Sequence, residues 1–259
     1  MIVDANCFLG HYPFRRLRHN TAESLLELMD RNGIAQAIVS SLHAVFYRDA
    51  HRGNEELHDE TKPFRDRLIP IAAVNPKYVG WVADLEQSVE QWQMRGVTLW
   101  PAHHGYDLRD EFGQAALERI EELGLPVVLT QRLEDRRQRH HWDIAEDLEQ
   151  QAILEIARTH PQLKIALCNW NGLDGDKLAA AGLKGRVLID FARLDVMVRG
   201  SVLKLIAALG ADCIAFGSHA PFDYLGPSLV KLESVAELAA NDLEKIAWRN
   251  AHQFFQLSE

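Results

Sequence analysis

The sequence predicts one α/β domain, residues 1–259, that folds as a (β/α)8 barrel. Eight short apolar segments recur along the chain, and their starts are 23 to 38 residues apart. They are apolar almost throughout instead of alternating with polar residues, as expected of parallel strands that are covered on both faces. Amphipathic segments with helical spacing fill the intervals. Eight strand–helix units in about 250 residues are typical of such a barrel.

The predicted strands and helices follow one another in a regular order. The strands begin near Ile2, Ile34, Leu68, Gly96, Leu125, Leu163, Arg186 and Cys213. The helices are predicted over Thr21–Asn32, Trp81–Met94, Asp110–Leu123, Ile144–Ala157, Ser201–Leu209, Ser228–Ala240 and Asn241–Phe255. Segments around Glu55 and Asp176 show a less regular pattern. No G-x-G-x-x-G follows the first strand, which disfavours an open dinucleotide-binding sheet, and no linker divides the chain.

Composition limits the classes of function. The chain has 28 Lys and Arg against 37 Asp and Glu, which gives a formal net charge of −9. This balance argues against nucleic acid, which needs a basic surface, and gives no attraction to anionic lipid. Three cysteines lie in apolar segments and are interpreted as buried thiols, not disulfides. With no leader or membrane span visible, we expect a soluble, cytoplasmic protein.

In a barrel of this kind, chemistry lies at the carboxyl ends of the strands. The polar and aromatic residues at those ends are therefore the candidates for a functional site. They are Asn6, Phe8, His43, Asn75, Trp100, His103, His104, Thr130, Gln131, Asn169, Asp190, Arg193 and His219.

Several of these segments resemble the amidohydrolase-related family, which includes the aminocarboxymuconate-semialdehyde decarboxylase-like enzymes. Residues 2–10 (IVDANCFLG) resemble its first strand, 96–101 (GVTLWP) its fourth and 124–129 (GLPVVL) its fifth. Residues 216–222 (FGSHAPF) resemble its eighth strand, and Asn250-Ala251 is similar to its terminal helix motif. The resemblance implies an amidohydrolase-like barrel and a hydrolase or a non-oxidative decarboxylase, usually one that depends on a metal.

The chain departs from that family at every metal-binding position. The family's His-x-His pair corresponds to Asn6 and Phe8, its strand-five His to Thr130, its strand-six His to Asn169 and its strand-eight Asp to His219. The Lys that some relatives carry on strand four is Thr98. Zinc needs three or four nitrogen, sulfur or carboxylate ligands, and only His219 remains among these positions. The sequence therefore predicts no bound metal and no cofactor, with a relocated site of His43, His103 and His219 as the alternative.

The first hypothesis for function is a metal-independent hydrolase or lyase that acts on a small organic acid or a lactone. His219 would serve as general acid or base, since an imidazole titrates near neutral pH. Asn6 and Asn169 would stabilise developing oxygen charge. In the alternative interpretation, His219 is a hydrogen-bonded core residue and the two amides bond to each other.

A set of residues around the three catalytic candidates is predicted to bind substrate. Arg193 would anchor a carboxylate, unless it pairs with Asp190 or Asp195. Phe8 and Trp100 would form apolar walls, unless they belong to the core. The other predicted substrate-binding residues are His103, Thr130 and Gln131.

Two basic loops follow the first and fifth strands. They carry Arg15, Arg16, Arg132, Arg136 and Arg137. In one interpretation, these loops form a positively charged entrance to the barrel, and the second loop acts as a lid. In the alternative interpretation, both loops are solvated surface.

Two other functions remain open at this point. The loss of all five site positions also fits a non-catalytic barrel that binds a metabolite or serves as a scaffold. A conventional metal-dependent hydrolase with relocated ligands is the third. We expect a small molecule as substrate or ligand, and a homo-oligomer is compatible with the sequence, although no helix face indicates an interface.

Overall fold

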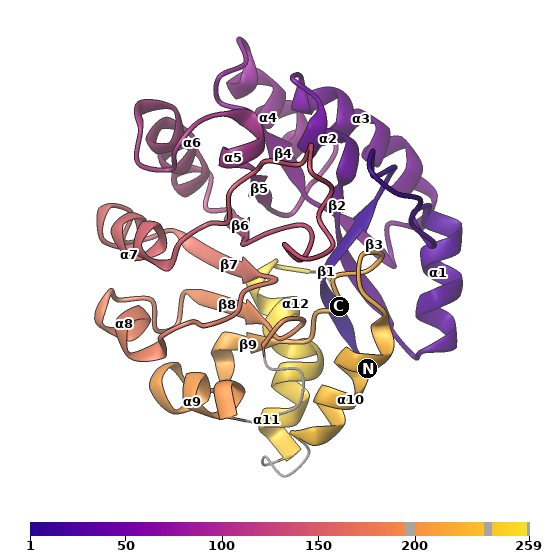
Figure 1. Ribbon diagram of the computed structural model, residues 1–259, viewed down its shortest axis with the longest axis vertical. Helices are drawn as coiled ribbons and strands as arrows, with labels where there is room; N and C mark the ends of the chain where they lie inside the picture. Colours follow the sequence, from indigo (N-terminus) through magenta and orange to yellow (C-terminus); the bar gives the residue numbers. More distant parts are fainter. Residues whose placement is uncertain (195–199, 236–239, 258–259) are drawn as a thin grey trace.

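A computed structural model describes residues 1–194, 200–235 and 240–257 of the chain. Short strands lie around a common centre, with helices outside them (Figure 1). The strands are β1 (Val3–Leu9), β2 (Gln36–Ser41), β3 (Leu68–Pro70), β4 (Ala72–Val74), β5 (Val97–Leu99), β6 (Pro126–Thr130), β7 (Lys164–Cys168), β8 (Val187–Asp190) and β9 (Ile214–Ala215). All eight apolar segments of the sequence contain a strand, and the third contains two.

Neighbouring strands are parallel and follow the order of the chain. One sheet runs β1-β2-β3 and the other runs from β4 to β9. Ile71, between β3 and β4, donates its N–H to Val39 O, and Ala72 donates to Gly96 O, so this strand passes from β2 to β5. The last strand returns to the first, since Ala5 N donates to Phe216 O at 2.9 Å. The predicted (β/α)8 barrel is confirmed; that residues 1–259 form one domain stays a prediction.

The helices occupy most of the predicted intervals. They are α1 (Ala22–Arg31), α2 (Leu42–Phe46), α3 (Ala50–Thr61), the 3-10 turn η1 (Lys62–Phe64), α4 (Trp81–Glu90), α5 (Pro101–His104), α6 (Glu111–Glu122), α7 (Gln150–Thr159), α8 (Gly175–Ala180), α9 (Gly200–Leu209), η2 (Ala211–Cys213), α10 (Leu225–Ser234), α11 (Ala240–Glu244), the π turn η3 (Lys245–Arg249) and α12 (Asn250–Phe254). Thr21 and Asp110, the residues before α1 and α6, cap them by accepting backbone N–H groups. The short helices α2 and α5 were not predicted.

Three predicted helices differ from the structure by three or more residues at an end. The helix predicted over Trp81–Met94 is α4, which ends at Glu90. The helix predicted from Ile144 begins at Gln150, because the residues before it run extended over the barrel. The helix predicted over Ser228–Ala240 is α10, which ends at Ser234; residues 236–239 of that prediction lie outside the described part of the chain.

The core has two interior levels inside the ring of strands. The lower level contains Val3, Ile69, Val128 and Leu188, and Phe255 at the end of the chain closes it from below. The upper level, at the carboxyl ends of the strands, combines the rings of Phe8, Trp100 and Phe222 with aliphatic residues such as Leu42 and Leu133. The three cysteines are buried and unpaired, as predicted. Among the described helices, none has the length and apolar character needed to cross a membrane.

Candidate functional site

Three polar side chains meet at the carboxyl ends of the strands, as their positions in the sequence predict. Asn6 comes from β1, Asn169 follows β7, and His219 follows β9. Asn6 Nδ2 lies 3.3 Å from His219 Nδ1, and Asn169 Nδ2 lies 3.2 Å from His219 Nε2. Both Asn169 (φ +57°) and His219 (φ +59°) adopt left-handed backbone conformations, which are uncommon for residues other than glycine and concentrate at functional sites.

The hydrogen bonds around His219 determine which ring nitrogen carries the hydrogen. Asn6 Nδ2 is 2.5 Å from Asp190 Oδ2, so it is the amide nitrogen of Asn6 that faces the carboxylate and His219. His219 Nδ1 therefore accepts from Asn6. Nε2 lies 2.6 Å from Leu133 O, which can only accept, so Nε2 carries the hydrogen and donates it.

The side chain of Asn169, beside His219, also donates a hydrogen bond to a backbone carbonyl. Its Nδ2 donates to Arg132 O at 2.6 Å, next to the bond from His219 Nε2 to Leu133 O. Two side-chain donors therefore point at two consecutive backbone carbonyls of the segment that follows β6. That segment arches over the centre of the ring (Figure 1).

Burial controls the electrostatics of the site. His219 is fully buried, and burial lowers its pKa, so the ring is neutral near pH 7. Asp190 is also buried, and burial raises its pKa to about 6 in spite of the hydrogen bonds from Asn169 N and Asn6 Nδ2. The site is a neutral imidazole and two amides around one carboxyl group that titrates closer to neutral pH than usual.

Aromatic rings fill the mouth of the barrel above these groups. The edge of Phe8 meets the His219 ring at 5.3 Å between centroids, and Phe222 stacks on His219 at 5.2 Å. Trp100 lies 6.1 Å from Phe8. Phe8 and Trp100, predicted as possible walls of a substrate site, are almost fully buried within this aromatic cluster.

Four of the predicted substrate-binding residues line one small cavity. They are Trp100, His103, Thr130 and Gln131. The segment 131–148 covers the cavity, which has a volume of about 20 Å³. This space holds about one water molecule, so it admits no organic substrate while the segment is in place.

Several N–H groups of the residues that line this cavity lack a hydrogen-bond acceptor among the described residues. They are Trp100 Nε1, Arg132 Nε and Arg139 Nε, all buried. His103 Nε2 is 3.5 Å from Asp143 Oδ1, at the limit of a hydrogen bond. A cavity whose buried unpartnered atoms are donors is complementary to a ligand rich in acceptors.

Arg193, also predicted to bind substrate, does not line this cavity. Its Nη1 pairs with Asp135 Oδ2 at 2.9 Å, and its Nε donates to Asn169 Oδ1 at 3.2 Å. It forms no ion pair with Asp190, so that alternative was wrong, and Asp195 lies outside the described residues. In this conformation Arg193 holds the covering segment and Asn169 and is not free to bind a carboxylate.

The ion pairs of the two loops contradict the prediction that these loops form a positively charged mouth. Arg15 pairs with Glu134, Arg132 and Arg136 pair with Asp147, and Arg137 pairs with Asp135. Among the described residues, acidic residues of the second loop thus pair with four of the five arginines predicted to form that mouth, all except Arg16.

A buried acidic cluster over the mouth escaped the sequence analysis. Tyr12 OH is 3.0 Å from Glu134 Oε2 and 3.3 Å from Asp143 Oδ2, and both carboxylates are nearly inaccessible. Burial, and then the two carboxylates, raise the pKa of the Tyr12 hydroxyl. The two loops carry no periodic pattern, so no sequence signal indicates this contact. Asp190 was listed among the strand-end candidates, but its only predicted contact was with Arg193, and its hydrogen bonds with Asn6 and Asn169 were not predicted.

The residues at the family's metal positions do not fit a metal ion. Asn6 and Asn169 present amide nitrogens to their neighbours, and both nitrogens of His219 have hydrogen-bond partners. Phe8 contributes a ring, and Thr130 a hydroxyl. Throughout the described residues, His, Cys, Asp and Glu form no group of three placed to hold a metal.

The relocated metal site is not assembled either. His43 Nδ1 pairs with Glu56 Oε2 at 2.5 Å, and His103 lies near Asp143. His219 is enclosed by aromatic rings, and these three histidines belong to separate contacts.

Comparison with solved structures supports the fold. The chain is similar to 5-carboxyvanillate decarboxylase from Sphingomonas paucimobilis, with a TM-score of 0.78, 13% identity and 99% of each chain covered. A 2,6-dihydroxybenzoate decarboxylase from Rhizobium has a TM-score of 0.71 and 17% identity, with 98% of each chain covered. A dihydroxybenzoic acid decarboxylase from Polaromonas sp. JS666, solved with bound manganese and 2-nitroresorcinol, has a TM-score of 0.73 and 17% identity and covers 98% of this chain and 96% of its own. At this identity the likeness establishes the fold alone. No curated protein sequence matches the chain.

A comparison with protein families decides the ancestry. The family model described as amidohydrolase matches residues 10–257, nearly the whole chain. The matched range includes the segments that resemble the family's fourth, fifth and eighth strands, and it begins just after the first strand. The chain belongs to the amidohydrolase family.

Proposed function

We propose that this protein is an amidohydrolase-family enzyme that hydrolyses or decarboxylates a small organic acid or a lactone without a bound metal ion. One observation carries the proposal. His219 Nε2 and Asn169 Nδ2 each donate a hydrogen bond of 2.6 Å to one of two consecutive carbonyl oxygens, those of Leu133 and Arg132. Such a pair of donors suits the two oxygens of a carboxylate or an ester.

Substrate would bind where those two backbone carbonyls now lie. The segment 131–148 must withdraw first, because the cavity beneath it has only about 20 Å³. Its movement would expose the donors of His219 and Asn169 together with Trp100 Nε1, which has no partner among the described residues. A closing lid of this type excludes water from the bound substrate.

The hydrogen-bond pattern supports a donor role for His219 in place of the general-base role inferred from sequence. A general base at Nε2 would need the hydrogen on Nδ1, where the Asn6 amide already donates. The neutral ring with its hydrogen on Nε2 instead polarises a substrate carbonyl, as neutral histidines do in other barrels. Asn6 holds that tautomer, and Asn169 adds a second donor to the developing oxygen charge.

The test is a turnover assay on aromatic hydroxy acids, aliphatic acids and lactones, with and without chelator. We expect turnover that EDTA leaves unchanged and a metal content far below one per chain. His219→Ala and Asn169→Ala should each lower kcat/KM by about 100-fold or more, the usual effect of removing one such donor. Glu118→Ala, at an exposed residue of α6 outside the segment 131–148, is the control and should retain wild-type activity. Near-stoichiometric metal, with activity lost on chelation and regained with manganese or zinc, contradicts the proposal.

A second candidate is a barrel that binds a small acid without turnover. The observation in its favour is that the protein's own atoms engage both nitrogens of His219. An acid that raises the melting temperature in wild type but not in Asn169→Ala, with no product formed, would select this candidate.

A further inference from the structure

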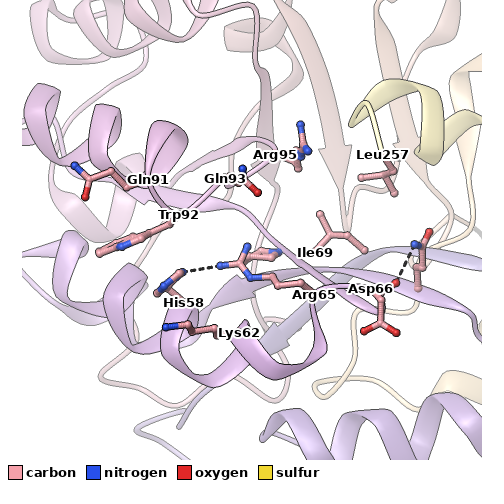
Figure 2. A pocket seen from close by; sticks show the side chains of 12 residues that line it. His58, Lys62, Arg65, Asp66, Ile69, Gln91, Trp92, Gln93, Arg95 and Leu257 are labelled. Atoms are coloured by element: carbon pink, nitrogen blue, oxygen red, sulfur yellow. Dashed lines mark hydrogen bonds between the residues drawn. The ribbon is translucent and has the colours of Figure 1, made fainter. Parts of the chain in front are cut away.

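A second cavity lies at the opposite end of the barrel. Its volume is about 580 Å³, within the range of small-molecule sites. It opens where β3 and β5 begin, between the end of α3 with η1 on one side and the turn 91–95 on the other. Figure 2 shows His58, Lys62 and Trp92 on one side of it and Leu257 on the other. Because the catalytic candidates lie at the carboxyl ends, this pocket is independent of the proposed function.

The pocket has an excess of positive charge. Lys62, Arg65 and Arg95 line it, against a single carboxylate, Asp66. Within the described part of the chain, no ion pair involves any of the three cations, whereas Arg15, Arg132, Arg136 and Arg137 above the mouth are each paired. A local net charge of +2 in a protein whose total is −9 calls for an anionic ligand.

Arg65 is held in a fixed position. Its Nη2 donates to His58 Nδ1 at 2.7 Å, as the dashed line in Figure 2 shows. The His58 ring stacks on Trp92, 5.1 Å between centroids and 19° between planes, and His51 also stacks on Trp92. Burial and then the charge of Arg65 lower the pKa of His58, so the ring stays neutral and accepts from the guanidinium. A preorganised cation loses less entropy when it binds a ligand.

The other residues that line the pocket add apolar and amide groups to the cations. Ile69 and Leu257 supply apolar area beside the cations, and Gln36 and Gln91 supply amide groups. Gln93 lines the pocket with a left-handed backbone, φ +52°.

We propose that this pocket binds a small phosphorylated metabolite. A phosphomonoester carries a charge of about −2 at neutral pH and three acceptor oxygens, which matches the net charge of Lys62, Arg65, Arg95 and Asp66. Guanidinium groups bind phosphate with two parallel hydrogen bonds. The amides would contact hydroxyls of the organic part, and the apolar residues its carbon atoms.

Isothermal titration calorimetry on the full chain tests the proposal. The probes are inorganic phosphate, glycerol 3-phosphate, citrate and chloride. We expect both phosphates to bind, the ester more tightly, and the affinity to fall with added salt. In Arg95→Gln, and in Arg65→Gln with Arg95→Gln, the dissociation constant should rise at least tenfold.

The controls separate this site from general charge effects. Arg158→Gln makes the same charge change at an exposed residue of α7 outside the pocket and should leave the constant within twofold. Arg95 is exposed, so its substitution keeps the test valid even where loss of Arg65 disturbs His58. Absence of phosphate binding, binding of citrate alone, or equal weakening by Arg158→Gln would overturn the proposal.

Discussion

Asp190 is the residue on which the buried site depends. Its carboxylate accepts from Asn6 Nδ2 and from the backbone N–H groups of Asn169 and Ala192. Asn6 in turn sets the tautomer of His219. The amide of Asn6 thus connects the carboxyl group of Asp190 to the imidazole of His219, and Asp190 fixes the direction in which the amide points.

The raised pKa of Asp190 makes the stability of the protein depend on pH. Because burial shifts the pKa from 3.8 to about 6, the folded state holds the proton more tightly than the unfolded chain. The stabilisation is complete below pH 3.8 and is lost as the pH rises through 6. It amounts to about 3 kcal/mol, since one pKa unit corresponds to about 1.4 kcal/mol. We expect the free energy of unfolding of wild type, relative to Asp190→Asn, to fall by up to that amount between pH 4 and 7.

Urea unfolding of both proteins across this pH range provides the measurement. Glu118→Gln, at an exposed carboxylate of α6, is the control and should run parallel to wild type. If the curves of wild type and Asp190→Asn are also parallel, then Asp190 titrates at its ordinary pKa.

At the scale of elements, the segment 131–148 shows where helical periodicity misleads. The apolar spacing after Ile144 predicts a helix, yet α7 begins at Gln150. Leu148 N donates to Gln131 O at 3.1 Å, which ties the end of the segment back to the end of β6. Asp147 accepts from three arginines of the same segment. These contacts hold the segment over the barrel, and the helix begins only after them.

Asp147 is therefore predicted to govern the opening of this segment. Its carboxylate is largely buried and pairs with Arg132, Arg136 and Arg139, at 2.8, 2.9 and 2.8 Å. Asp147→Asn leaves the three arginines without a counter-charge. We expect amide hydrogen exchange across 131–148 to become at least about tenfold faster, since local opening that costs 1.4 kcal/mol less is ten times more populated.

Hydrogen-exchange mass spectrometry would measure this opening. Glu122→Gln removes a partner from an exposed ion pair of α6 with Arg119 and should change little there or in the segment. Unchanged exchange in Asp147→Asn would show that the other contacts of the segment, such as the ion pairs of Glu134 with Arg15 and of Asp135 with Arg193, are enough to hold it in place.

Across the whole molecule, a feature can be predicted from the sequence when a regular pattern of residues along the chain encodes it. Strands covered on both faces are apolar along their length, so all eight segments were recognisable. Asn6, Asn169 and His219 were expected to meet because strand ends converge in a barrel. The pairing of Arg193 with Asp135, by contrast, depends on the path of a loop that has no period. The buried acidic cluster over the mouth was missed for the same reason.

Phe255, near the end of the chain, closes the lower end of the barrel. This contact leads to a prediction about the stability of the whole molecule. Phe255 is almost fully buried and belongs to the same interior cluster as Val3 and Ile69, so the final helical turn packs inside the ring that the first strands begin. Phe255→Ala should lower the free energy of unfolding by about 3–5 kcal/mol, as other large-to-small changes in cores do. Its neighbour Phe254 is only partly buried and provides the matched control. Phe254→Ala should lower the free energy of unfolding far less. Chemical unfolding followed by both fluorescence and circular dichroism would measure the two losses. A single coincident transition is expected for both variants if residues 1–259 fold as one domain, whereas a floor that unfolds before the strands would contradict that prediction.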